Sequence, residues 1–139
     1  MIEFNNVTKS KINLARLQKL LKLINQILKN RGEQTISLVF VSPLKIKSLN
    51  KIYRGKNKVT DVLSFNIADE LDKSNLGEII ICASRATTQA REFKHSFQKE
   101  IERLFLHGYL HLCGFDHEKE KEAVMMESLE EKVLKKFYV

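Results

Sequence analysis

Three of the four histidines lie within eleven residues, in the segment His107-Gly-Tyr-Leu-His111-Leu-Cys-Gly114-Phe-Asp-His117. On a helix, residues four apart share a face, so the rings of His107 and His111 can converge on one ion. Gly114 can adopt the left-handed conformation that ends a helix, and the chain can then turn so that His117 supplies a third ligand. Three imidazoles with an open fourth position are typical of catalytic zinc. We therefore predict one zinc ion. The alternative is an accidental cluster of solvated histidines near a helix C-terminus.

The same spacing occurs in the zinc-protease motif H-E-x-x-H-x-x-G-x-x-H, but Gly108 stands where the motif has its glutamate base. The missing base points to a metal-assisted hydrolase whose chemistry is not standard peptide cleavage. We expect open space at Gly108 to admit a bulky phosphodiester; alternatively, the glycine only lets the helix pack closely. Cys113 could be a thiolate ligand, but two residues past His111 is about 200° around a helix. We interpret it as a small buried hydrophobe.

A second group of polar residues lies upstream, in the run Tyr53-Arg54-Gly-Lys56-Asn-Lys58. A planar guanidinium followed by two lysines can clamp a phosphate. Lys56 and Lys58 are candidate RNA-binding residues. Such segments are also common in surface turns, and Thr60-Asp61 before an apolar strand could be simple turn chemistry.

The net charge of +7 is unevenly spread. Residues 1–58 carry 13 Lys and Arg against 2 acids, whereas residues 59–139 carry 11 against 15. A basic half beside a metal site favours an anionic substrate, with nucleic acid as the leading candidate. The alternative is compositional, since 18 of the 24 basic residues are lysine, as an AT-rich genome would produce.

Length and composition predict one domain over residues 1–139, of which 43% are hydrophobic. No apolar run approaches the roughly 20 residues needed to cross a membrane. The N-terminal residues do not resemble a signal peptide. Two cysteines, Cys82 and Cys113, do not form a disulfide framework. These features favour a cytoplasmic protein.

Hydrophobic periodicity predicts the elements that must position these residues. We expect strands over residues 1–7, 35–41, 61–67 and 77–82. We expect helices over residues 10–30, 43–53 and 84–94, a fourth that Ser96 caps and that carries the histidines, and a last one over 118–137. Core packing is expected along the last helix at Met125, Leu129, Val133 and Phe137.

Taken together, these segments resemble the YbeY family of bacterial endoribonucleases. The family pattern HGxLHLxGYDH is read here as HGYLHLCGFDH, and N-x-x-Y-R-x-K-D-x-P-T-D-V-L-S-F is matched by Asn50 to Phe65. A G-[ED]-I-x-I strand is matched by Gly77 to Ile81, and the helix start at His95-Ser96 is also similar. Departures from the pattern occur at Asn57, Val59, Asn66 and Phe115.

The resemblance implies a zinc-dependent endoribonuclease that acts on single-stranded ribosomal RNA. It implies maturation of the small-subunit RNA end and ribosome quality control, with ribosomal RNA and the small ribosomal subunit as partners. His107, His111 and His117 would be the zinc ligands and Arg54 the catalytic arginine. The implied fold is α+β, a four-stranded mixed sheet packed against about five helices, with the zinc site at the end of the fourth helix.

Two other functions fit parts of the sequence. A zinc peptidase would explain the histidine spacing, although Gly108 and the basic half count against it. A non-catalytic, zinc-stabilised ribosome assembly factor would explain the missing base. For the nuclease, the sequence leaves open whether activated water or the 2′-hydroxyl of RNA is the nucleophile.

Overall fold

The computed structural model of the chain describes residues 2–6, 8, 10–30, 34–66, 75–115 and 118–139. In these residues, four strands and five helices follow one another as β1 (Ile2–Asn6), α1 (Leu14–Leu28), β2 (Thr35–Val41), α2 (Pro43–Arg54), β3 (Val62–Asn66), β4 (Asn75–Cys82), α3 (Ala83–Glu92), α4 (Phe97–Leu112) and α5 (Glu120–Phe137). The order and type of every element predicted from the sequence are confirmed. None of the helices described is long and apolar enough to cross a membrane.

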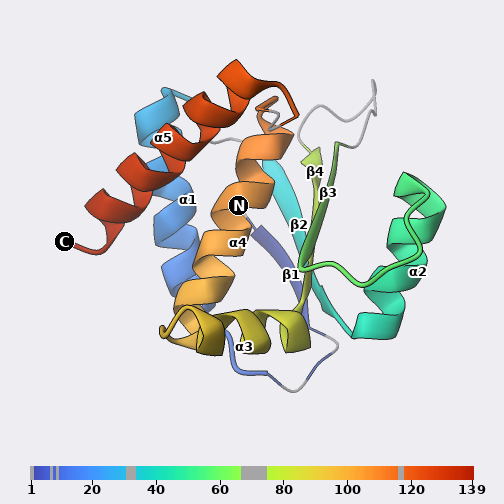
Figure 1. The fold of residues 1–139 in the computed structure, drawn as a ribbon. Helices are drawn as coiled ribbons and strands as arrows, with labels where there is room; N and C mark the ends of the chain where they lie inside the picture. The colour runs from blue at the N-terminus through green and yellow to red at the C-terminus, as the bar shows by residue number, and fades with distance from the viewer. Residues whose placement is uncertain (1, 7, 9, 31–33, 67–74, 116–117) are drawn as a thin grey trace.

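The strands form one sheet in the order β1-β2-β4-β3. The pairs β1–β2 and β2–β4 are parallel, and β3 pairs with β4 in the antiparallel direction. This is the mixed sheet that the resemblance implied. The antiparallel strand β3 lies at one edge of the sheet (Figure 1). There the side chain of Arg54, the last residue of α2, bonds to it.

Side chains alternate between the two faces of the sheet along each strand. Helices pack against both faces. In β2, Ile36, Leu38 and Phe40 are fully buried on the face that α1, α4 and α5 cover. Val39 and Val41 point the other way and pack with Ile46 of α2. Figure 1 shows α2 alone on its side of the sheet, opposite the other large helices. The fold is therefore a single α+β unit.

Capping residues mark where the helices begin, and α1 begins later than periodicity predicted. The side chain of Asn13 accepts a hydrogen bond from the Arg16 amide, so α1 begins at Leu14 rather than near residue 10. Ser42 and Ser96 cap α2 and α4 in the same way, each accepting from the amide three residues on. The predicted role of Ser96 is therefore confirmed.

The predicted core stripe on α5 is wrong at one position. Val133 is buried, and Leu129 and Phe137 pack partly buried against the core, but Met125 is 56% exposed and Met126 is buried instead. Each helical residue rotates by about 100°. Position 126, seven residues before Val133, is thus about 20° from its face, whereas position 125 is about 80° away.

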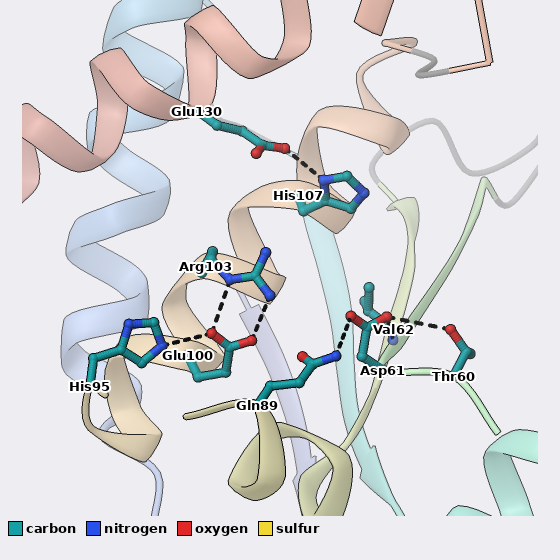
Figure 2. A network of polar contacts seen from close by, with 9 residues as sticks. All are labelled: Thr60, Asp61, Val62, Gln89, His95, Glu100, Arg103, His107 and Glu130. Atoms are coloured by element: carbon teal, nitrogen blue, oxygen red, sulfur yellow. Dashed lines mark hydrogen bonds and ion pairs between the residues drawn. The ribbon is translucent and has the colours of Figure 1, made fainter. Parts of the chain in front are cut away.

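Buried charges fix α4, the helix that carries two of the predicted ligands. Glu100 is fully buried and accepts hydrogen bonds from Arg103 at 2.6 and 2.9 Å and from Nε2 of His95 at 2.8 Å (Figure 2). On another side of α4, Glu102 accepts from Arg16 at 2.7 Å. Because buried carboxylates need such partners, these contacts hold the helix in one orientation.

Candidate active site

His107 and His111 lie one turn apart on α4, and their Nε2 atoms are 3.2 Å from each other. Two nitrogens held about 2.0–2.1 Å from one tetrahedral zinc ion lie about 3.3 Å apart. The two rings therefore converge as the spacing predicted, at a separation that fits one shared zinc ion, and their binding of zinc stays a prediction. His117 lies outside the described residues, so its role as third ligand stays a prediction. Among the residues that the structure does describe, no group of three or more His, Cys, Asp or Glu side chains is placed to hold a metal.

A carboxylate on α5 contacts this pair. Glu130 accepts a hydrogen bond from Nδ1 of His107 at 2.6 Å, and Figure 2 shows its side chain reaching from α5 to the imidazole. Sequence reasoning missed Glu130. The segment before and within α5 contains several glutamates, and nothing local shows which of them faces α4.

The end of α4 has the geometry predicted from its glycine. Gly114 has a φ of +100°, its amide donates to the carbonyl of His111 at 3.0 Å, and the next amide donates to that of Leu110 at 3.1 Å. These bonds satisfy the last helical carbonyls and end the helix directly after the histidines. Asn66 of β3 adds a bond from its side-chain amide to the carbonyl of Leu112 at 3.0 Å.

Cys113 is not part of the histidine pair. Its thiol lies 3.9 Å from the side-chain nitrogen of Asn30, beyond the end of α1, and packs against the core. Burial raises the pKa of this thiol, which disfavours the thiolate that binds metal. Cys113 therefore packs as a small hydrophobe, as predicted, but it is only partly and not fully buried.

A cleft of about 640 Å³ brings together the histidine segment and the basic segment that were predicted to form the site. Arg54, Lys56 and Lys58 line it together with His107 and His111. These residues are about 50 positions apart in the sequence, and the sheet edge at β3 joins them. The cleft thus holds the imidazole nitrogens of two histidines and three cationic side chains within one cavity.

Arg54 is the last residue of α2, and its side chain is exposed but held by contacts with β3. Its Nη2 donates to the carbonyl of Ser64 in β3 at 2.9 Å, and its guanidinium carbon lies 5.7 Å from the centre of the Phe65 ring. Gly55 follows with a φ of +68° and ends the helix, which turns the chain towards Lys56 and Lys58. The guanidinium of Arg54 is therefore held at the edge of β3.

Polar contacts also fix the loop that leads into β3. The side-chain amide of buried Asn50 donates to the carbonyl of Lys58 at 3.0 Å. One oxygen of Asp61 accepts from the amide of Val62 at 2.8 Å, and the other accepts from Gln89 of α3 at 3.2 Å (Figure 2). Asp61 thus combines the predicted turn chemistry with a tie to α3. Asn50 begins the segment that matches the family pattern, but its bond to Lys58 and the bond of Gln89 to Asp61 were not predicted.

Gly108 packs against the sheet. A Cβ built there would lie 3.1 Å from Cγ2 of Ile79 and 3.5 Å from Cγ2 of Val62. Gly108 does line the cleft, but the side chain it lacks would meet the sheet. The expectation that its absence leaves space for substrate is therefore wrong, and close packing of α4 on the sheet accounts for the glycine.

Substitutions at Gly108 should consequently act on folding. Gly108→Ala should change the free energy of unfolding by no more than about 1 kcal/mol, since mild crowding opposes a helix-propensity gain of about the same size. Gly108→Glu should cost several kcal/mol, because it forces a carboxylate between apolar side chains. Urea unfolding of the two variants measures both effects. Equal stabilities for Glu and Ala would show that the position opens into solvent.

Comparison with known proteins identifies the family. The Endoribonuclease YbeY family model matches residues 3–138. An endoribonuclease YbeY from Phytoplasma australiense is 42% identical over 139 residues, which covers 97% of this chain and 94% of the relative. The endoribonuclease YbeY of Thermodesulfovibrio yellowstonii is 44% identical over 116 residues, covering 81% and 73%.

A solved structure agrees with this result. The solution structure of a Thermotoga maritima protein superposes with a TM-score of 0.62 at 30% identity, over 99% of this chain and 92% of that one. The chain therefore belongs to the Endoribonuclease YbeY family and is an enzyme of the hydrolase class.

Proposed function

We propose that the protein is a zinc-dependent endoribonuclease that cuts single-stranded RNA. The observation that carries this proposal is that the His107–His111 nitrogen pair lines the same cleft as Arg54, Lys56 and Lys58. A nuclease needs such a combination, because it must bind a phosphodiester and stabilise the charge that develops on it during cleavage.

Five of the residues that line the cleft have a role in this proposal. His107 and His111 hold the zinc ion, together with His117. When bound, zinc supplies a Lewis acid that withdraws charge from a phosphoryl oxygen and acidifies water. Arg54 contacts the scissile phosphate and neutralises its growing charge, and its bond to Ser64 orients the guanidinium beforehand. Lys56 and Lys58 bind neighbouring phosphates.

The nucleophile is either a water molecule or the 2′-hydroxyl of the RNA. These routes leave different ends, because attack by the 2′-hydroxyl yields a 2′,3′-cyclic phosphate and attack by water does not. Mass spectrometry of the cleaved fragments distinguishes them.

The proposed substrate is ribosomal RNA, cut during maturation of the small-subunit RNA end and in ribosome quality control, with the small ribosomal subunit as partner. Family membership and the basic first half of the chain support this assignment. A cytoplasmic location belongs to the same proposal and agrees with the two cysteines, which are unpaired. The peptidase and the non-catalytic assembly factor are disfavoured, because the family is one of nucleases.

The affinity for RNA should depend steeply on salt. Three phosphate contacts in the cleft predict that the logarithm of the association constant falls with log salt at a slope of about −2, from roughly 0.7 per contact on a single strand. The double variant Lys56→Ala/Lys58→Ala should reduce that slope by about 1.4. Fluorescence anisotropy with a short unstructured RNA measures it.

A matched control is available on α5. Lys132 and Lys135 are exposed and do not line the cleft, so their double alanine variant carries the same charge change elsewhere. If that control lowers the slope as much as the cleft variant does, RNA binding depends on overall charge and the assigned phosphate contacts are wrong.

A further inference from the structure

Glu130 of α5 stands in contact with a predicted metal ligand without lining the cleft itself. Its carboxylate accepts a hydrogen bond from Nδ1 of His107 at 2.6 Å. The two side chains are only 20% and 29% exposed, so water competes weakly for this bond. The contact joins residues 23 positions apart on two helices.

This contact fixes the tautomer of His107. A carboxylate only accepts hydrogen bonds, so Nδ1 must carry the proton, and in the neutral ring Nε2 then presents its lone pair. That Nε2 is the atom that lies 3.2 Å from Nε2 of His111. The lone pair is therefore on the nitrogen that faces the proposed ion.

The rest of the structure holds Glu130 at this position. Met126 and Val133, one turn before it and one turn after it on α5, are both buried. Arg103, one turn before His107 on α4, donates to Glu100, as Figure 2 shows. Hydrogen bonds to Glu100 raise the pKa of Arg103 and the charge of Glu130 adds to the effect, although burial opposes them.

We propose that Glu130 is a positioning residue that sets the zinc affinity of the site. It holds the His107 ring in one orientation and tautomer and increases the electron density at Nε2. Carboxylates that accept from a metal-binding imidazole act in this way in general. The effect on the tautomer follows from the geometry alone, whereas the effect on zinc affinity rests on the proposed function.

Zinc affinity provides the first test. Glu130→Ala should weaken zinc binding by about 10–100-fold, measured by competition with a chromogenic chelator. Glu130→Gln should weaken it less, since its amide oxygen can still accept from Nδ1. Glu131→Gln is the matched control, because Glu131 is the exposed neighbour of Glu130 on α5. This variant should bind zinc as tightly as the unaltered protein.

The tautomer provides a second test that needs no metal. In the metal-free protein at about pH 9, well above the ordinary imidazole pKa of about 6.5, the nitrogen shifts of His107 should show the proton on Nδ1. In Glu130→Ala it should move largely to Nε2, whereas Glu131→Gln should not alter it. Should Glu130→Ala fail to fold, as judged by urea unfolding, Glu130→Gln supplies the affinity measurement.

Two results would overturn the proposal: an unchanged tautomer in Glu130→Ala, or zinc affinities within twofold of each other in all variants. Failure of the proposed function looks different. If the unaltered protein binds no zinc but the tautomer moves as described, the metal assignment is wrong and Glu130 still positions His107.

Discussion

His111→Ala is expected to strip zinc from the protein and to abolish cleavage of RNA. The substitution removes one of the two nitrogens that converge at 3.2 Å. Zinc sites with four protein ligands bind with about 10–16 kcal/mol, or roughly 3 kcal/mol per ligand, so the dissociation constant should rise more than a hundredfold. Elemental analysis after dialysis measures the zinc, and an end-labelled RNA measures the cleavage.

The fourth histidine supplies the control for this experiment. His95 is bonded to Glu100 and does not line the cleft, so His95→Gln should keep its zinc even if it is less stable. A normal zinc content in His111→Ala would contradict the assignment of the metal site. Loss of zinc from both variants would show that the loss reports unfolding.

Arg54→Ala should lower the rate of RNA cleavage by about 10²–10³-fold, the usual effect of removing one donor to a developing oxyanion. The free energy of unfolding should fall by no more than about 1 kcal/mol, because an exposed side chain with one hydrogen bond contributes little. Single-turnover cleavage and urea unfolding together separate the two effects.

Lys51 is the matched control for Arg54. It lies in the last turn of the same helix and is exposed, but it does not line the cleft. Lys51→Ala should therefore cleave at nearly the normal rate. If Arg54→Ala unfolds the protein, or if both variants lose activity equally, Arg54 has no specific place in the reaction.

Local patterns were sufficient to predict the parts of the site that lie within one element. The four-residue spacing of His107 and His111 predicted their shared helix face, and Gly114 predicted the end of that helix. The apolar runs predicted the strands, and Ser96 predicted the start of α4. In each case the information lies within a few residues of the feature, because helix periodicity and capping are local effects.

Other parts depend on which residues from distant elements meet, and the sequence does not state this. Glu130 faces His107 only because α5 packs on α4, and several neighbouring glutamates would have been equal candidates. Gly108 was misinterpreted for the same reason: its side of α4 faces Ile79 and Val62 of the sheet. The error at Met125 arose because the predicted stripe took every fourth residue, whereas the helix has 3.6 residues per turn, so the stripe rotates away from the buried face along α5.

The measurement that tests the account most directly uses one RNA containing a single-stranded segment and a duplex segment. The protein is assayed as purified, after removal of metal by a chelator, and after zinc is added back. We predict cuts confined to the single-stranded segment, lost with the metal and regained with zinc. Equal cleavage by the metal-free protein, or cleavage of the duplex at the same rate, would contradict a zinc-dependent, single-strand-specific endoribonuclease.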